Sequence, residues 1–185
     1  MAKQGKRTLL FMDASHFVFG AFLGFVWCVV RWFVQTGSGR QRWNILGAVD
    51  VVTHKIHTVM NDTYITSTQV CEMLRKLAAE STLPITIVLD NARYQRCKLV
   101  MNTASELGIE LLFLPTYSPN LNLIERLWKL VKKRSLRIRY LPNFDAFREA
   151  LIKGIEDLNE NGQKELATLM APNFQSFKDL PILKR

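Results

Sequence analysis

The pattern of hydrophobic and polar positions predicts several strands early in this chain of 185 residues, followed by an alternation of helices and strands. Short apolar runs rich in β-branched and aromatic residues favour strands, and the glycines between them favour turns. We therefore expect a strand at 7–13, one or two strands within 17–34 with a turn near Gly20 to Gly24, a turn at 37–40, and two strands within 43–60.

The remainder of the chain alternates helical and strand patterns. Val70, Leu74 and Leu77 recur at helical spacing, which predicts a helix over 66–80. Its N-cap is expected to be Thr66 or Ser67. The other expected elements are strands at 84–90 and 109–115, a helix at 94–106 stopped by Gly108, a helix that begins near Asn122, and an amphipathic helix at 143–158.

The order of these elements predicts an α/β fold, in which a mixed sheet carries helices on its faces. A chain of this length is expected to form one domain with a substantial core. We expect residues 1–140 to form the main body. Residues 141–185 are expected to form a C-terminal helical extension packed on the same domain.

Charge changes this picture more than composition does. The hydrophobic fraction of 48% and charged fraction of 22% are ordinary for a globular domain, but the net charge of +9 is not. Such an excess of bases favours a polyanionic partner, nucleic acid first and an acidic membrane second. The apolar run at 17–30 is shorter than the roughly 20 residues of a membrane-spanning helix, so we expect no membrane insertion.

The cysteines bound the chemistry further. Cys28, Cys71 and Cys97 are far apart and form no CxxC pair, which argues against a zinc site and against a disulfide framework. The three histidines do not complete a metal-ligand set with them. We therefore expect a reducing, cytoplasmic setting.

Three acids stand out by their positions. Asp13 ends the first predicted strand, Asp90 ends the strand at 84–90, and Glu125 lies in the first turn of the helix that follows. Sites in mixed α/β sheets gather at the carboxyl ends of strands and beside helix N-termini, so the three carboxylates can converge. Clustered carboxylates repel one another unless cations lie between them. Mg²⁺ and Mn²⁺ prefer such oxygen ligands, and two ions of this kind can run phosphoryl displacement.

Each acid also has a purely structural explanation. An aspartate at a strand end is commonly a turn residue, and the pair Asp90–Asn91 is a strong turn signal. Glu125 can simply complement the dipole of its helix. Only the joint pattern of the three acids favours a catalytic site.

Three blocks of sequence carry a specific resemblance. They read "FMDASHFV" (11–18), "IVLDNARYQ" (87–95) and "LPTYSPNLNLIERLWKLVKK" (114–133), and 34 residues lie between Asp90 and Glu125. With these blocks the chain resembles the catalytic domain of DDE transposases. The branch is the mariner-like one that includes the bacterial insertion-sequence family numbered six-thirty and is related to retroviral integrases and RNase H-like nucleases. The likeness covers about residues 7–140.

The resemblance implies an RNase H-like mixed sheet of about five strands with helices on both faces. It also implies DNA cleavage and strand transfer with two Mg²⁺ or Mn²⁺ ions. Asp13 would contact both ions, while Asp90 and Glu125 would each complete one. Asn122 matches the start of the catalytic helix and Trp128 the aromatic that packs it on the sheet. Two positions depart from the pattern: Gln95 stands where many relatives have histidine, and Leu123 where many have proline.

The basic run after Glu125 is expected to hold the DNA backbone. It contains no acid between residues 126 and 139, which makes a merely solvated helix face less plausible than usual. Contacts of this kind give affinity and register without reading sequence. The expected DNA-binding residues are Arg126, Lys129, Lys132, Lys133, Arg134, Arg137 and Arg139.

Asn91, Asn122 and His16 are candidates for supporting the acids. If the first strand continues past Asp13, side-chain alternation places His16 on the opposite face, whereas a turn at Ala14 and Ser15 would bring it to the site. The remaining aromatic candidates have structural explanations instead of binding roles. His54 and His57 are expected on the surface, and Trp27, Trp32 and Trp43 in the core.

Three functional classes are compatible with these observations. The first is a transposase catalytic domain, acting as a homodimer on transposon ends and target DNA in a prokaryotic cytosol or nucleoid. A separate or upstream helix-turn-helix part would then read the ends, because seven residues before the first strand cannot hold one. The alternatives are a stand-alone RNase H-like nuclease, which cuts without joining, and an inactive nucleic-acid-binding remnant.

Overall fold

The computed structural model describes residues 5–20, 29–30, 41–115, 121–137 and 139–171. Residues 172–185 and most of the strands and turns expected between Gly20 and residue 40 lie outside this described part, together with Trp27, Trp32 and Cys28. Its elements are β1 (Thr8–Val18), β2 (Arg42–Asp50), β3 (Ile56–Asn61), α1 (Ser67–Glu80), β4 (Ile85–Leu89), α2 (Lys98–Glu106), β5 (Glu110–Phe113), α3 (Ile124–Ser135), α4 (Phe144–Asn161) and α5 (Gln163–Leu169).

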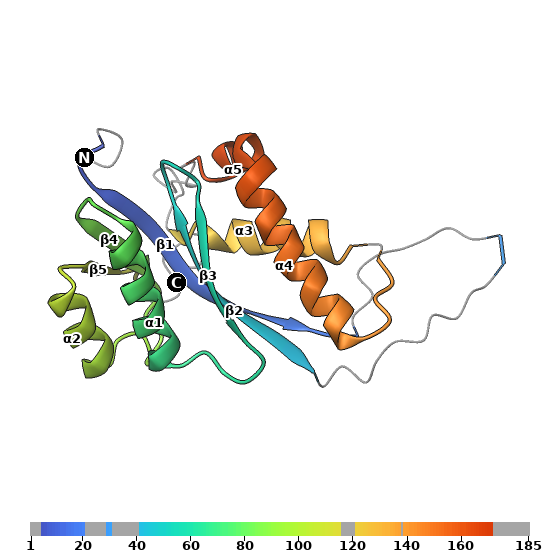
Figure 1. The fold of residues 1–185 in the computed structure, drawn as a ribbon, viewed down its shortest axis with the longest axis horizontal. Coiled ribbons are helices and arrows are strands. Elements are labelled where there is room, and N and C mark those ends of the chain that lie inside the picture. Colours follow the sequence, from blue (N-terminus) through green and yellow to red (C-terminus); the bar gives the residue numbers. More distant parts are fainter. Residues whose placement is uncertain (1–4, 21–28, 31–40, 116–120, 138, 172–185) are drawn as a thin grey trace, which may run out of the picture.

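One mixed sheet of five strands organises these elements. The strand order is β3-β2-β1-β4-β5. β1 pairs with β2 in antiparallel fashion, as β2 does with β3, whereas β1 with β4 and β4 with β5 are parallel. Figure 1 shows α1 and α2 gathered beside β4 and β5, and α3, α4 and α5 gathered toward the other side of the molecule. The predicted mixed α/β sheet with helices on both faces is confirmed.

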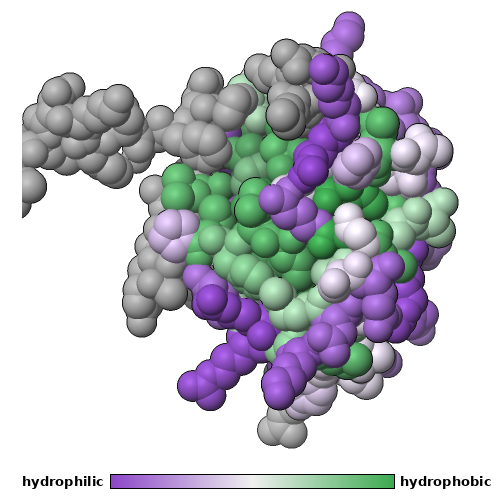
Figure 2. Space-filling view, turned by 90° about the vertical axis from the view of Figure 1, so that its left-hand side faces the viewer, coloured by the Kyte–Doolittle hydropathy of each residue, from purple (hydrophilic) through white to green (hydrophobic). Residues whose placement is uncertain are grey.

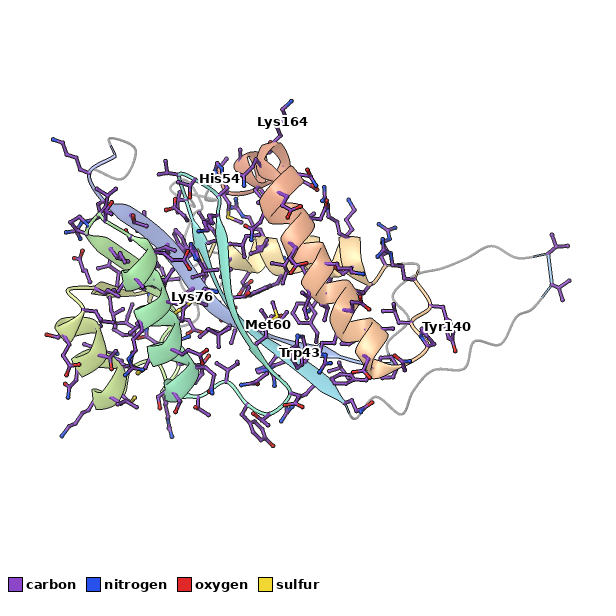
Figure 3. The ribbon with its side chains drawn as sticks, viewed as in Figure 1. Trp43, His54, Met60, Lys76, Tyr140 and Lys164 are labelled. Atoms are coloured by element: carbon purple, nitrogen blue, oxygen red, sulfur yellow. The ribbon has the colours of Figure 1, made fainter. Side chains whose placement is uncertain are left out.

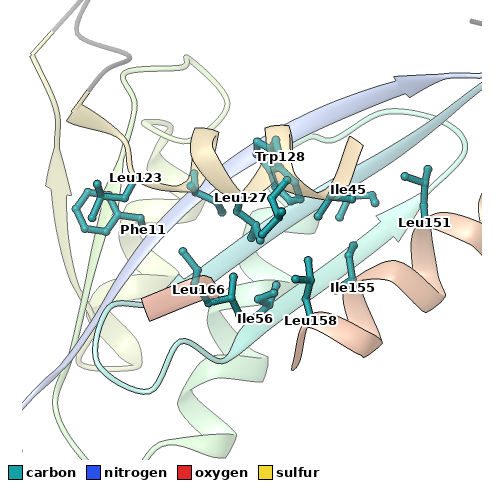
Figure 4. Close-up of a cluster of buried hydrophobic side chains, with 14 of the residues drawn as sticks. Phe11, Ile45, Ile56, Leu123, Leu127, Trp128, Leu151, Ile155, Leu158 and Leu166 are labelled. Atoms are coloured by element: carbon teal, nitrogen blue, oxygen red, sulfur yellow. The ribbon is translucent and has the colours of Figure 1, made fainter. Parts of the chain in front are cut away.

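Alternating side chains of the strands feed two separate cores. On β1, Leu10 and Met12 pack with α1 and α2, whereas Phe11 and Phe17 pack with α3 and α4. Figure 4 shows the second core, where Leu127 of α3 and side chains of α4 meet the sheet. Because side chains alternate along a strand, odd-numbered residues of β1 face α3.

The ends of α1 and α2 follow from their sequences. The Thr66 hydroxyl accepts from the backbone of the first turn of α1, and Gln69 reaches back to the Thr66 amide, which completes a capping box. At the end of α2, Gly108 has φ of 65°, its amide donates to Ser105 O, and the Ile109 amide donates to Ala104 O. This is the Schellman arrangement that the expected stop at Gly108 requires.

Several boundaries differ from the sequence-based expectations. β1 continues to Val18 because β2 pairs with it as far as Val18 and Arg42. α2 begins at Lys98 and not at residue 94, because residues 93–95 turn, with the Gln95 amide donating to Ala92 O. α3 begins at Ile124, two residues past Asn122, and α5 was not expected at all.

Exposed apolar residues gather on one side of the surface. Figure 2 shows an apolar area with hydrophilic side chains around it, on the side of the molecule where α2 and β5 lie. Leu99 of α2 and Leu112 of β5 are 51% and 46% exposed. Within the described part, no helix combines the length and apolar character that a membrane crossing demands.

Candidate catalytic carboxylate site

Two aspartates on neighbouring strands are brought together by the parallel register of β1 and β4. Phe11 pairs with Val88. Continuing that register by two residues sets Asp13 opposite Asp90. Partners in a parallel pair point to the same face, and Phe11 and Val88 both belong to the core beneath α3. Asp13 and Asp90 therefore share the α3 face of the sheet.

Glu125 approaches from the helix that covers this face. It lies in the first turn of α3, and Trp128, one turn later, is buried with 5% of its surface exposed. The indole lies against Gly47, which is the register partner of Asp13, and its ring meets the edge of Phe17 at 6.1 Å between centroids. Trp128 thus packs α3 on the sheet directly beside the first acid, as expected.

The electrostatics of Asp13 link the three acids. The pKa of Asp13 is raised from 3.8 to about 6, mainly by burial and also by the negative charges of Asp90 and Glu125. The backbone amide of Ala14 and the indole N–H of Trp128 act in the opposite direction. Both neighbouring carboxylates are therefore close enough to act on Asp13. Burial contributes more to this raised pKa than like-charge repulsion does.

Two buried polar atoms beside these acids have no hydrogen-bond partner among the described residues: Nε1 of Trp128 and Oδ1 of Asn122. The Trp128 N–H lies near enough to Asp13 to lower its pKa, but it does not complete a hydrogen bond of ordinary geometry. Unpaired buried polar groups are costly and usually have a specific explanation, such as a water or an ion that completes the site.

The donor chemistry fits hard divalent ions. In the described part of the chain, no three His, Cys, Asp or Glu side chains form a group that could hold a metal ion. A pair of ions that share Asp13, one completed by Asp90 and the other by Glu125, needs only two protein carboxylates for each ion. The remaining ligands of such ions are commonly water and phosphate oxygens.

His16 lies away from this site. β1 runs without a turn through Ala14 and Ser15, so His16 points to the face opposite Asp13. Its Nδ1 lies 2.6 Å from Oδ1 of Asn44 on β2. The expectation that His16 supports the acids is therefore wrong, because the strand is longer than its apolar pattern suggested.

Asn91 and Asn122 have different surroundings. Nδ2 of Asn91 donates to the Leu114 carbonyl, and its Oδ1 accepts from Arg96 at 3.2 Å, so it ties the end of β4 to the end of β5. Asn122 is 4% exposed, and its carbonyl accepts from the Glu125 amide at 3.2 Å. Asn91 directly follows Asp90, and Asn122 lies three residues before Glu125; their support of the acids stays a prediction.

Tyr94 borders the site and was not singled out from the sequence. Burial raises its pKa to about 12, and the charges of Asp90 and Asp13 contribute, which places its phenol near both acids. Its hydroxyl accepts from Nε2 of Gln95 at 3.4 Å. Gln95, at the position where many relatives have histidine, is fully buried and its Oε1 has no partner in the described part. The only sequence signal for Tyr94 was its nearness to Asp90.

The basic run divides into two groups. Arg126 donates from Nη1 to the carbonyls of Leu169 and Ala171, both at 2.9 Å. Arg134 pairs with Asp157 of α4 and Glu165 of α5. These two guanidinium groups are engaged within the fold, so we no longer assign them to DNA. The exposed members of the run are Lys129, Lys132, Lys133, Arg137 and Arg139.

Two predictions about aromatic residues can be compared with the fold. His57 is 8% exposed and lies 3.4 Å from the Glu80 carboxylate, so its expected surface position is wrong. It is a β3 residue that faces α1, and burial lowers its pKa. Trp43 lies at the start of β2 beside α4 and packs on Phe144 (Figure 3), in agreement with a core position.

A mixed five-stranded sheet with helices on both faces, which carries one acid on β1, a second directly after β4 and a third in the first turn of α3, has the fold of the RNase H-like class. The model of the DDE superfamily endonuclease family matches residues 8–148, which is most of the chain. The chain therefore belongs to the DDE superfamily endonucleases, and the expected membership in the DDE superfamily is confirmed. No curated protein matches the sequence.

Solved structures agree on the fold. A chain of the simian T-cell lymphotropic virus intasome matches with 16% identity and a TM-score of 0.62, over 96% of this chain and 59% of that one. The HTLV-2 integrase catalytic core in complex with magnesium, in a dimeric form, matches with 15% identity and a TM-score of 0.57, over 83% and 86%. A pre-cleavage Mos1 transpososome chain matches with 12% identity and a TM-score of 0.58, over 90% and 57%. The chain thus spans less than two thirds of the first and third of these relatives.

Proposed function

We propose that this chain is the catalytic domain of a transposase that cleaves DNA strands and joins their 3′ ends to target DNA. The observation that carries the proposal is the convergence on one face of the sheet. Asp13 stands opposite Asp90 in register, and the charge of Glu125 acts on Asp13 across the gap to α3. Membership in the DDE superfamily endonucleases supports the same reaction.

The three carboxylates are proposed to hold two Mg²⁺ or Mn²⁺ ions, with Asp13 shared between them. When bound, the ions would supply activation of the attacking water or 3′-hydroxyl and stabilisation of the leaving oxygen. Asp13 must give up its proton to act as a ligand, and its raised pKa makes that step sensitive to pH. Trp128 and the sheet exclude water from one side of the site.

DNA is proposed to run from these acids over the exposed side of α3. Lys129 lies four residues after Glu125, and Lys132 and Lys133 continue the same i, i+3, i+4 stripe of the helix. Their ammonium groups would hold the phosphate backbone without reading its sequence. A homodimer in the active complex, a helix-turn-helix part that reads the transposon ends, and a cytoplasmic location remain predictions that accompany this proposal.

A joining assay tests the proposal against its alternatives. The purified chain is incubated with a labelled duplex that has a free 3′-hydroxyl and a supercoiled plasmid, in Mg²⁺ or Mn²⁺ and in chelator. Ion-dependent joined product is expected. Ion-dependent cutting without joining would indicate a stand-alone nuclease, and DNA binding without either reaction would indicate an inactive remnant. Either of these outcomes contradicts the proposal.

A further inference from the structure

Gly47 occupies a position in β2 where any side chain would collide with the helix that carries Glu125. A Cβ atom there would lie 2.4 Å from Cη2 and 2.8 Å from Cζ2 of Trp128, and 3.4 Å from Cδ1 of Ile124. Contacts under 3.0 Å require something to move, and glycine within a strand often marks such a close approach. The indole of Trp128 therefore rests directly on the backbone of β2.

The indole has little freedom to give way. The Phe17 ring packs against it at 81° between the ring planes, and Nζ of Lys132 lies over the Phe17 ring at 5.5 Å from its centroid. Ile124, in the preceding turn of α3, approaches the same position, since its Cδ1 would lie 3.4 Å from a Cβ at residue 47. Gly47 is also the register partner of Asp13, so the ring touches the strand pair exactly where the first acid is carried.

We propose that Gly47 is a positioning residue for the carboxylate site, whose missing side chain sets the spacing between the Glu125 helix and the strand that carries Asp13. The inference rests on the proposed function. A methyl group at position 47 would push Trp128 outward and, because Trp128 lies one turn from Glu125, would carry that carboxylate away from Asp13. Misplacement of catalytic groups by about 1 Å can reduce rates on the order of 100-fold.

The test compares Gly47→Ala with a matched variant, Gly154→Ala. A Cβ at Gly154 of α4 would lie 2.0 Å from Oγ of Ser135, so it also collides with α3, but at the end of the helix far from Glu125. Two quantities are measured for each: the melting temperature, and the Mn²⁺ concentration that gives half-maximal DNA cleavage. We expect Gly47→Ala to need at least about tenfold more Mn²⁺, with an unchanged KM for DNA. Gly154→Ala should leave the Mn²⁺ requirement unchanged, because rotation of the Ser135 hydroxyl can relieve its clash at the far end of α3.

Rescue by Trp128→Phe makes the test decisive. Phenylalanine lacks the two indole atoms that Gly47→Ala would strike, so the Gly47→Ala, Trp128→Phe double variant should recover the Mn²⁺ requirement of Trp128→Phe alone. No recovery, or an equal change in Gly154→Ala, would overturn the inference. A wild-type chain without ion-dependent cleavage would instead contradict the proposed function. Melting temperatures alone would then test the contact. Gly47→Ala should lower the melting temperature in the wild type but not in Trp128→Phe, and an equal loss in both proteins would overturn the inference.

Discussion

The two faces of the sheet differ in how completely their helix ends and buried polar atoms are hydrogen-bonded. On the face of α1 and α2, Thr66 completes a capping box for α1 and Gly108 ends α2, although Cys97, the N-cap of α2, makes no side-chain cap hydrogen bond. On the other face, Asn143 caps α4 by accepting from the Ala146 amide, but Leu123, the N-cap of the helix that carries Glu125, makes no side-chain cap hydrogen bond. Buried polar atoms without partners also collect there in the described part, on Trp43, Asn122, Trp128 and Ser135, with Gln95 the exception near α2.

This difference indicates which face of the sheet carries interactions that cost the fold stability. Protein segments generally satisfy local rules of capping and polar pairing, and departures from those rules cluster at functional sites. Here four of the five unpaired buried polar side-chain atoms of the described part lie on the face that carries Asp13, Asp90 and Glu125. We expect the α1 face to have a mainly structural role. The α3 face is the one that we expect to carry the catalytic residues, bind metal ions and contact DNA.

The largest effect should come from Asp90→Asn. It should reduce ion-dependent cleavage by on the order of 1,000-fold or more, because it removes a proposed metal ligand. Stability should stay equal or rise, since asparagine can still accept from the Ala92 amide and no longer repels Asp13. Cleavage rates and urea denaturation curves measure the two effects.

The matched control for Asp90 lies on the opposite face. Asp50 also ends a strand, and its Oδ1 accepts from the amides of Val52 and Thr53. Asp50→Asn should leave cleavage unchanged. Trp128→Ala provides the converse case, with an expected loss of ~3–5 kcal/mol in stability. An unfolded Asp90→Asn protein would mean that Asp90 is only a turn residue, and the contrast between the faces would then disappear.

A second, smaller effect should appear in the pH dependence of stability. The folded pKa of Asp13 is raised to about 6 above its ordinary 3.8, so its contribution favours folding below about pH 4 and is lost as pH rises through about 6. Asp13→Asn removes this titration. In chelator, the variant should therefore gain on the wild type between pH 4 and pH 7, to a difference of about 1–3 kcal/mol.

Urea denaturation of both proteins across this pH range gives the measurement. Glu72→Gln, at an exposed position on α1, is a suitable control because its difference from the wild type should stay flat. If the difference in unfolding free energy between Asp13→Asn and the wild type is also independent of pH, the pKa of Asp13 is not raised in the folded protein.

The smallest effect concerns DNA affinity. Lys129→Ala with Lys132→Ala should weaken binding to all DNA sequences alike and reduce the salt slope of log affinity by about 0.9 for each lost duplex phosphate contact. The cleavage rate at saturating DNA should change little, because these side chains position the backbone and do not touch the reacting oxygen. Binding measured between low and moderate salt gives the slope.

An equal change of charge elsewhere provides the comparison. Arg75 on α1 and Lys164 on α5, which points away from the body in Figure 3, are both exposed. Arg75→Ala with Lys164→Ala should leave the slope unchanged. If both pairs lower the slope equally, the α3 lysines contribute only general charge and the DNA path lies elsewhere.

Local signals made much of this architecture predictable. Periodicity and a cap were sufficient for α1, and the Gly108 stop defined the end of α2, because the interactions that form these ends are between near neighbours in the chain. The three acids were predictable as candidates because apolar runs end at Asp13 and Asp90 and a helix begins beside Glu125, although Asp13 lies within β1 and not at its end. Their convergence required the parallel register of β1 and β4, which no local pattern specifies.

The misses share one physical cause, which is contact between residues far apart in the chain. The acid-free basic run suggested an open helix face, but Asp157 and Glu165 reach Arg134 from later helices. His57 looked exposed until α1 covered β3. Gly47 resembled any glycine in an apolar run, because its role depends on an indole more than eighty positions away.

The two hydrogen bonds from Arg126 to residues at and just after the end of α5 bear on which fragment of the chain can fold. The family match stops at residue 148, inside α4. Arg126, next to Glu125, nevertheless donates hydrogen bonds to the carbonyls of Leu169 and Ala171, which lie beyond that point. A fragment trimmed to the matched region would expose the buried side of α3 and release its first turn. We therefore expect the smallest stable fragment to extend to at least residue 171, because the contacts of α4, α5 and Ala171 hold the helix that carries Glu125.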